Sequence, residues 1–290
     1  MTGVRPPAGD TLLVGVDGSA SNRAAVEWAA CEAEATDRAL ALVAVLDDVA
    51  FLAPSVTSDV DCVRARQVLG EIAAGARRDH PQLRVTHDMQ IGGTVTTLLD
   101  QSADRAAVVV GKRGRGAFGR MMLGSTSTGL AGRSRVPVVV VPDAWQADAH
   151  TGEPVVVGVD PGQDLDRPLR WAMARAGRLG VPLHVVHSTD LSRAVVWDPQ
   201  VEVMVDRDWM RRRSEDVLAG LELARKDFPD VDATLVEDQE HPVDLLLRRA
   251  AGAQLIVLGR RRPAKFGFTL GSVARGVLHH ASVPVAVIPS

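Results

Sequence analysis

Short apolar runs alternate with longer amphipathic stretches along the first half of the chain. The apolar runs predict strands and the stretches between them predict helices, with strands over 11–16, 39–46, 83–90, 106–111 and 136–141 and helices over 21–36, 59–80, 94–101 and 125–134. The last two strands contain consecutive valines without polar alternation, which is typical of strands covered on both faces. The pattern therefore predicts a parallel sheet between helix layers, with any ligand at the carboxyl ends of its strands.

The second half of the chain repeats this plan. The segment LVGVDG around Asp17 recurs as VVGVDP around Asp160, an offset of 160 − 17 = 143 residues. A Trp-Ala pair follows each aspartate by eleven residues, and the closing segments around Pro137 and Pro284 match at an offset of 284 − 137 = 147. Landmarks repeated in the same order indicate a duplicated domain.

A polar stretch of linker composition, 143–153, separates the two copies. We therefore predict domains over 1–145 and 153–290, each a Rossmann-like α/β fold with a five-stranded parallel sheet between helices. The apolar closing runs 136–141 and 283–288 would be prone to aggregation if they stood as exposed edges. We therefore expect either a homodimer or an intramolecular pair of domains that covers them.

The composition is that of a soluble globular protein, with 46% hydrophobic residues, 24% charged residues and a net charge of −3. This balance gives no electrostatic reason to expect a nucleic acid or an anionic membrane as a partner. No apolar run approaches the roughly 20 residues that a membrane helix needs, and the first residues lack a basic segment followed by an apolar one. We therefore expect a cytoplasmic protein.

The cysteines and histidines do not form a recognisable metal motif in the sequence. Cys31 and Cys62 lack CxxC spacing, and the one adjacent histidine pair, His279 and His280, has no further ligands near it in the chain. We therefore expect reduced thiols and no bound metal ion.

A glycine-rich loop follows the fourth predicted strand. It reads GKRGRGAFGRMMLGS from Gly111 to Ser125 and leads into a helix that Ser125 would cap. Glycines permit positive φ angles and close backbone approach, so that backbone N–H groups can converge on phosphate oxygens. The N-terminus of the following helix adds the positive end of its dipole. The loop is therefore a candidate anion site.

Two common phosphate motifs do not fit this loop. Residues 114–119 spell GxGxxG, but the dinucleotide motif follows the first strand of its fold and precedes an acidic residue about 20 positions on. A P-loop has Lys and then Ser or Thr after its second glycine, where this chain has Arg120 and Met121. The loop therefore belongs to neither class.

These motifs together resemble the universal stress protein family, whose ATP-binding members carry G-x2-G-x9-G-[S/T] between strand four and its helix. Gly111, Gly114, Gly124 and Ser125 fit that spacing without gaps, and the resemblance covers nearly the whole chain twice. It implies that the first domain binds ATP, with or without Mg²⁺, through Gly15, Asp17, Val45, Gly111, Gly114, Arg115, Gly124, Ser125 and Thr126.

The resemblance also implies a role for each part of this set. Asp17 would contact the adenosine, the backbones of Gly15 and Val45 would line the adenine pocket, and the loop with Ser125 and Thr126 would hold the phosphates. An aspartate before a glycine is also ordinary turn chemistry, so a capping role for Asp17 stays open.

The second domain departs from the pattern at its loop. Arg262 replaces the inner glycine, the loop is one residue shorter, and Pro263 disfavours helical geometry at Arg262. If the inner position is left-handed, a residue with a Cβ atom costs about 1–2 kcal/mol there. We therefore predict a second site that is weaker than the first or empty, although the basic run 260–265 could hold phosphate by side chains. Its residues would be Gly158, Asp160, Gly259, Gly271, Ser272 and Val273.

The sequence as a whole predicts a nucleotide-dependent regulator of a stress response or of growth, with no catalytic residue assigned. One alternative is a slow ATPase or another adenine-nucleotide enzyme, for which the sequence offers no evident nucleophile or general base. The other is a nucleotide-free dimerisation or interaction module, which the second loop would suit. The segments 47–58 and 188–199, each after the second strand of its domain, are candidate positions for partner recognition.

Overall fold

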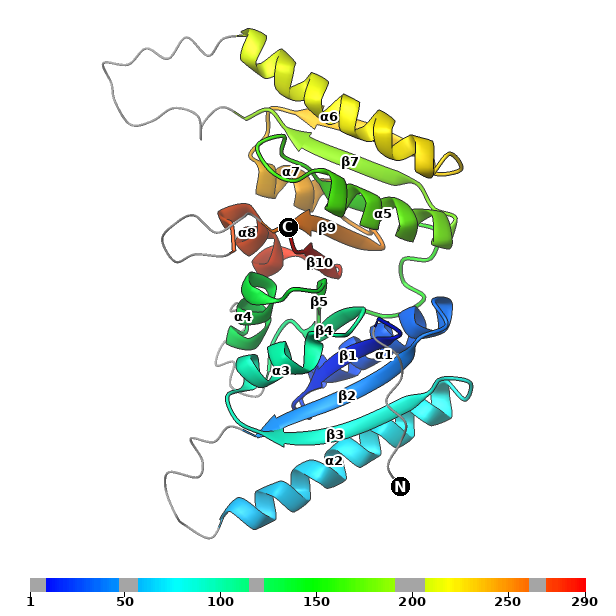
Figure 1. Ribbon diagram of the computed structural model, residues 1–290, viewed down its shortest axis with the longest axis vertical. Helices are drawn as coiled ribbons and strands as arrows, with labels where there is room; N and C mark the ends of the chain where they lie inside the picture. Colours follow the sequence, from blue (N-terminus) through cyan, green and yellow to red (C-terminus); the bar gives the residue numbers. More distant parts are fainter. Residues whose placement is uncertain (1–8, 47–56, 115–122, 191–206, 261–269) are drawn as a thin grey trace, which may run out of the picture. The chain divides into compact units, whose positions relative to one another are not determined.

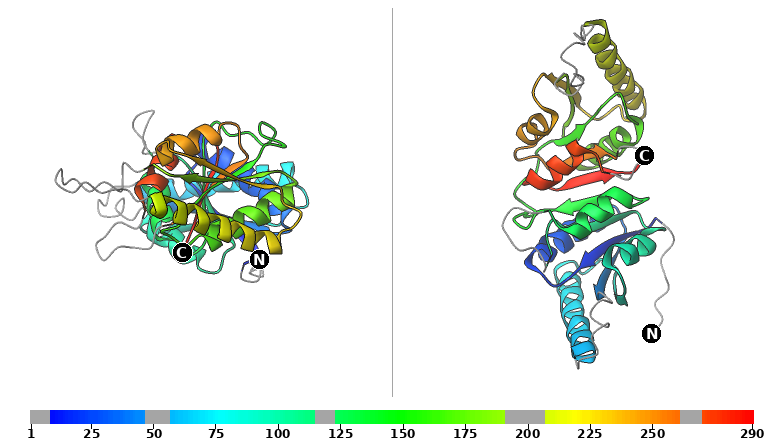
Figure 2. Two further views of the ribbon diagram at one scale, coloured as in Figure 1. Left: turned by 90° about the horizontal axis from the view of Figure 1, so that it is seen from above. Right: turned by 90° about the vertical axis from the view of Figure 1, so that its left-hand side faces the viewer.

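The computed structural model describes residues 9–46, 57–114, 123–190, 207–260 and 270–290 (Figure 1). The chain divides into two units, Met1–Asp148 and Ala149–Ser290. Each unit is a parallel sheet with helices on both faces, and these layers can be followed in the two views of Figure 2.

The first unit has five parallel strands in the order β3-β2-β1-β4-β5. In chain order its elements are β1 (Thr11–Val16), α1 (Ala20–Ala35), β2 (Ala39–Leu46), α2 (Thr57–Asp79), β3 (Val85–Ile91), α3 (Thr94–Ser102), β4 (Ala107–Gly111), α4 (Ser125–Arg133) and β5 (Val138–Val141). Because right-handed crossovers join parallel strands, α1 and α2 lie on one face of the sheet and α3 and α4 on the other.

The second unit has the same order, β8-β7-β6-β9-β10, again with parallel pairing throughout. Its elements are β6 (Val155–Gly158), α5 (Asp166–Leu179), β7 (Leu183–Ser188), α6 (Arg207–Asp227), β8 (Ala233–Asp238), α7 (Pro242–Arg249), β9 (Leu255–Gly259), α8 (Ser272–His280) and β10 (Val285–Ile288). The predicted fold, two tandem Rossmann-like α/β domains with five-stranded parallel sheets, is confirmed.

Burial along the strands follows the sequence pattern. Every residue of β4 and β5 is buried, as expected for valine-rich strands between two helix layers. Strand β3 forms one edge of the first sheet and carries the exposed polar residues Thr86, His87 and Asp88. Exposed polar side chains discourage pairing of that edge with another chain.

Glycines bring the paired helices of each unit into close contact. A Cβ atom on Gly129 of α4 would lie 3.0 Å from the Val95 side chain of α3, and one on Gly276 of α8 would lie 2.8 Å from Val243 of α7. The two glycines are 147 positions apart, the offset found for the closing strands. The duplicated fold therefore repeats a packing detail as well as a sequence pattern.

One predicted helix cap is wrong. Ser19 occupies the cap position of α1, and its side chain makes no capping bond. Helix α4 is capped by Gly124 rather than by Ser125, which is already helical. A cap position needs extended backbone, which Gly124 adopts with φ −64° and ψ 147°. The hydroxyls of Ser127 and Thr128 each donate to the Gly124 carbonyl over 2.9 Å.

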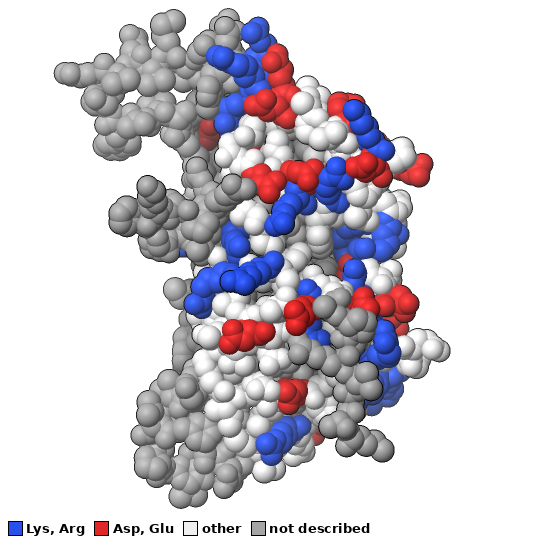
Figure 3. Space-filling view, in the orientation of Figure 1, with Lys and Arg blue, Asp and Glu red and all other residues white. Residues whose placement is uncertain are grey.

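Acidic and basic side chains are interspersed over the face of the molecule shown in Figure 3. Among the helices of the described residues, none combines the length and the apolar character that a membrane crossing requires.

Candidate functional site

The turn after β1 is held by Asn22, a buried residue of α1. The backbone N–H groups of Asp17 and Gly18 donate to Asn22 Oδ1, over 2.8 Å from Gly18, and Asn22 Nδ2 donates to the Gly15 carbonyl over 3.3 Å. The Ser19 N–H donates to Asp17 Oδ1 over 2.9 Å. Asp17 therefore does take part in turn chemistry, through one of its two carboxylate oxygens.

The other oxygen of Asp17 faces the glycine loop. A Cβ atom on Gly114 would lie 2.6 Å from Asp17 Oδ2, closer than real Cβ contacts occur. Strands β1 and β4 are hydrogen-bonded neighbours, so the sheet brings the two residues together at adjacent strand ends. Gly114 does not have a positive φ angle, so the inner position is not left-handed and the cost of a Cβ atom in that conformation does not apply here. A side chain at position 114 would therefore have to displace the carboxylate of Asp17.

The two ends of the loop are joined in a narrow neck. The Lys112 N–H donates to the Val141 carbonyl over 2.8 Å, and the Gly124 N–H donates to the Lys112 carbonyl over 3.0 Å. A Cβ atom on Gly124 would lie 3.3 Å from both Lys112 O and Ser127 Oγ. The neck therefore places the beginning of the loop beside the N-terminus of α4, where unpaired N–H groups favour an anion.

The neck carries positively charged side chains that are partly buried. Lys112 is only 9% exposed, and burial, followed by the nearby charge of Arg113, lowers the pKa of its ammonium group. Arg113 forms an ion pair with Asp143 over 3.3 Å.

The remaining predicted residues of the first unit lie around the same sheet edge. A Cβ atom on Gly15 would lie 3.0 Å from Leu98 of α3 and 3.1 Å from Val110 of β4, so glycine permits these elements to approach β1. Val45 is half-buried near the end of β2, Gly111 is buried as the last residue of β4, and Ser125 and Thr126 open α4. Arg115 lies outside the described residues.

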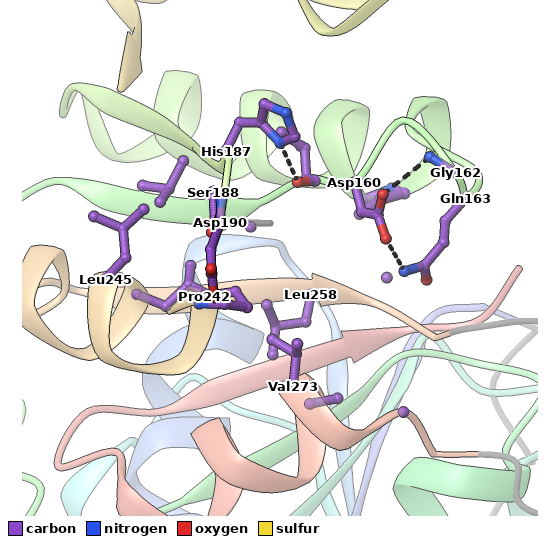
Figure 4. Close-up of a pocket in the computed structure, with 18 of the residues that line it drawn as sticks. Asp160, Gly162, Gln163, His187, Ser188, Asp190, Pro242, Leu245, Leu258 and Val273 are labelled. Carbon is purple, nitrogen blue, oxygen red and sulfur yellow. Dashed lines mark hydrogen bonds between the residues drawn. The ribbon is translucent and has the colours of Figure 1, made fainter. Parts of the chain in front are cut away.

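A cavity of about 390 Å³ opens at the corresponding edge of the second unit (Figure 4). Pockets for small ligands usually have volumes of about 300–1,000 Å³. Side chains of Leu246, Leu258 and Met210 supply apolar lining. All the residues predicted for the second site line this one cavity: Gly158, Asp160, Gly259, Gly271, Ser272 and Val273.

Asp160 has several partners within the cavity. Its Oδ1 accepts from the Gly162 N–H over 3.0 Å and from Arg213 Nη2 over 2.5 Å, and its Oδ2 accepts from Gln163 Nε2 over 2.9 Å. Burial would raise the pKa of Asp160, but the hydrogen bonds from Gln163 and Gly162 and the charge of Arg213 outweigh it and lower that pKa. Asp160 is therefore ionised at neutral pH and already paired with a cation.

His187 also lines the cavity and is 2% exposed. Its Nδ1 lies 3.3 Å from the Val159 carbonyl, which can only accept, so Nδ1 carries the proton in this contact. Burial lowers the pKa of His187, which leaves the ring neutral at pH 7 with Nε2 as an acceptor.

Sequence reasoning missed four residues at these two sites: Asn22, Gln163, His187 and Arg213. Asn22 and Gln163 follow the two strand-end aspartates by five and three positions, so their proximity was a usable signal. Arg213 lies 53 positions from Asp160 on α6, and the sequence alone offers no signal for that contact.

Comparison with known proteins places these features in a family. The model of the universal stress protein family matches residues 9–142 and 152–289. A universal stress protein of Mycolicibacterium smegmatis is 33% identical over 291 residues, which cover 96% of this chain and 96% of that protein.

Solved structures agree on the fold. The crystal structure of a universal stress protein from Archaeoglobus fulgidus aligns with a TM-score of 0.69 at 20% identity, covering 96% of each chain. A universal stress protein from Archaeoglobus fulgidus in complex with dAMP is 28% identical over 48% of this chain and 98% of that one. Its TM-score against this chain is 0.34.

Proposed function

Because this chain belongs to the universal stress protein family, we propose that its first unit binds ATP and that it acts as a nucleotide-dependent regulator of a stress response or of growth. The observation that carries this proposal is the contact of Gly114 with Asp17 beside a closed loop neck. This contact places the hydrogen-bonding carboxylate of Asp17 beside the loop whose backbone N–H groups would bind an anion, within a single site.

Each part of ATP has a matching surface in the first unit. Asp17 is a carboxylate at a strand end, which can accept hydrogen bonds from ribose hydroxyls. The adenine ring fits against the backbones of Gly15 and Val45, which lie on neighbouring strands. The phosphates fit the N–H groups at the start of α4, where Ser125 and Thr126 stand, and Mg²⁺ would offset part of their charge.

The second unit has residues that match those proposed to contact adenosine, but the residues at the phosphate position differ. Its cavity includes Asp160 and Gly158 at the end of β6, but Asp160 is engaged by Arg213 and the inner glycine of the loop is replaced. We therefore propose that the two sites are unequal and that the second binds ATP more weakly. We also propose that the protein is cytoplasmic and that it forms either a homodimer or an internal pair of domains.

The rival functions differ in what happens to ATP. A regulator binds it and releases phosphate slowly, an adenine-nucleotide enzyme turns it over rapidly with a second substrate, and an interaction module does not bind it. Measuring phosphate release at saturating ATP separates the first two. A direct binding test separates both from the third.

Substitution of Gly114 by valine tests the site. The added side chain would occupy the space of Asp17 Oδ2, so ATP affinity should fall at least tenfold, which is about 1.4 kcal/mol. A ligand present at 100 times its dissociation constant stabilises the folded state by about 2.7 kcal/mol, so ATP should raise the melting temperature of the wild-type protein. The Gly114→Val protein should lose most of this rise.

Gly70→Val is the matched control, because a Cβ atom on Gly70 of α2 would meet no atom within 4 Å. Its ATP-dependent rise in melting temperature should equal that of the wild type. An equal rise in the Gly114→Val protein would contradict the assigned site.

A further inference from the structure

A second group of chemically active side chains lies between α1 and the end of α2. Glu27 and Cys31 are one helical turn apart on α1, and Glu34 lies one turn further on. His80 directly follows α2, and its ring is held between the two glutamates. Helix α1 therefore presents one face to a histidine that is distant in sequence.

The distances suit a metal ion. One ligand atom from each of Glu27, Cys31 and His80 lies within 4.8 Å of the others. His80 Nε2 is 3.5 Å from Glu27 Oε2, and Cys31 Sγ is 3.8 Å from Glu27 Oε1. In a tetrahedral zinc site the ligand atoms are about 3.3–3.8 Å apart, so only small side-chain movements would be needed.

The two nitrogens of His80 have separate partners. Its Nδ1 lies 2.8 Å from Glu34 Oε2, which leaves Nε2 directed toward Glu27 and Cys31. A carboxylate on the far nitrogen is the usual way in which a metal-binding histidine is oriented. The backbone at His80 is also fixed, because its N–H donates to Ala76 O over 2.9 Å and its carbonyl accepts from Leu83 over 3.0 Å.

The electrostatic environment favours a cation, because the carboxylates of Glu27 and Glu34 both lie beside the imidazole of His80. The His80 side chain is only 10% exposed, whereas the two glutamates are 42% and 39% exposed, so the group opens to solvent on the carboxylate side. An ion could enter from that side and keep a water molecule.

We propose that Glu27, Cys31 and His80 form a binding site for a thiophilic divalent transition metal ion, with Zn²⁺ as the best match. A thiolate, an imidazole and a carboxylate form a ligand set typical of zinc, and three protein ligands leave a fourth position for water. Glu34 orients the imidazole without binding the ion. Binding displaces the thiol proton into solvent.

The site is separate from the proposed nucleotide site. Helix α1 begins at Ala20, just after the strand-end turn, and Cys31 lies 31 − 20 = 11 positions further along it. At about 1.5 Å per helical residue, Cys31 lies roughly 17 Å along the helix from that end. Loss of the metal should therefore leave ATP binding unchanged.

Cobalt titration of the intact, reduced and chelator-treated chain tests the proposal. The wild-type protein should bind one equivalent of Co²⁺ with a thiolate-to-cobalt charge-transfer band in the near ultraviolet, and Zn²⁺ should remove that band. Cys31→Ser should abolish the band. Cys62→Ser, the control at the other cysteine, should keep it.

Glu34→Gln tests the orienting role. The charge-transfer band should remain, but the affinity for Co²⁺ should fall by about 10- to 100-fold, the usual effect of losing such a partner. Unchanged affinity in this variant would overturn the role of Glu34. Absence of the band in the wild-type protein, or its survival in Cys31→Ser, would overturn the metal site itself. Unchanged ATP binding in Cys31→Ser would show that the fold is intact.

Discussion

Asp17 and Asp160 hold the same position in the two repeats but have different surroundings. Asp17 lies against the backbone of Gly114, whereas Asp160 is paired with the guanidinium of Arg213. A ligand hydroxyl at Asp160 must share that carboxylate with an existing cationic partner. Single residues therefore give the two sites different chemistry on the same fold.

The ion pair between Asp160 and Arg213 predicts how the stability of the fold depends on pH. The folded-state pKa of Asp160 is below its ordinary value of 3.8, so the pair stabilises the fold above pH 3.8. This stabilisation is lost as the pH falls through the folded-state pKa. Asp160 is 43% exposed, so screening limits the contribution to about 0.2–1 kcal/mol. Urea unfolding should show Arg213→Met less stable by this amount at pH 7, with a difference that shrinks below pH 3.8.

Arg211→Met is the control on the same helix, because Arg211 pairs with Glu215 where both side chains are more than 60% exposed. Its effect at pH 7 should be smaller than that of Arg213→Met. A stability difference for Arg213→Met that did not change with pH would show that the effect comes from packing rather than from Asp160.

The packing of paired helices helps to position the residues of the proposed sites. In each unit a glycine permits close contact between the third and fourth helices, α3 with α4 and α7 with α8. Because α4 begins at the loop neck, a displaced α4 would move the N–H groups that we propose bind phosphate. Packing remote from the ligand therefore contributes to the geometry of the site.

Gly276→Ala tests this close contact. The added methyl group would lie 2.8 Å from Val243, so overpacking should lower the free energy of unfolding by about 1–3 kcal/mol. Gly220→Ala on α6, where the nearest atom would be 3.6 Å away, should instead raise it by about 0.4–1 kcal/mol. Urea denaturation measures both. If Gly276→Ala proved as stable as Gly220→Ala, the contact would not constrain the helices.

The elements of the first unit could be predicted because their apolar runs are separated by clear breaks, and the bounds that differ have local causes. Strand β3 begins at Val85 instead of residue 83 because the Leu83 N–H is used in a turn with the His80 carbonyl. Strand β5 begins at Val138 because Pro137 has no N–H to donate.

The side-chain contacts between distant elements were not predictable in this way. The Asp160–Arg213 and Glu27–His80 contacts each join residues 53 positions apart, through helices whose rotation the sequence pattern does not specify. The sequence reading therefore expected no metal ligands at Cys31, although the fold brings histidine and glutamate beside it. Glycine spacing was informative because it marks backbone contacts, which the duplicated fold preserves.

At the scale of the whole molecule, duplication gives one chain two related sites that differ in the residues around them. The first unit keeps the inner glycine Gly114, and the second has Arg262 at that position and an ion pair at Asp160. Such a chain would respond to ATP through one tight site, while the second cavity remains available at higher concentration or for another ligand. This inequality is the central claim of the proposed function.

Calorimetric titration of the intact chain with ATP tests that claim most directly. We predict one tight site per chain, at least tenfold stronger than any second site, and we predict that Gly114→Val removes the tight phase while leaving any weak phase in place. Two sites of equal affinity in the wild-type protein, or a tight phase that survives Gly114→Val, would contradict the account.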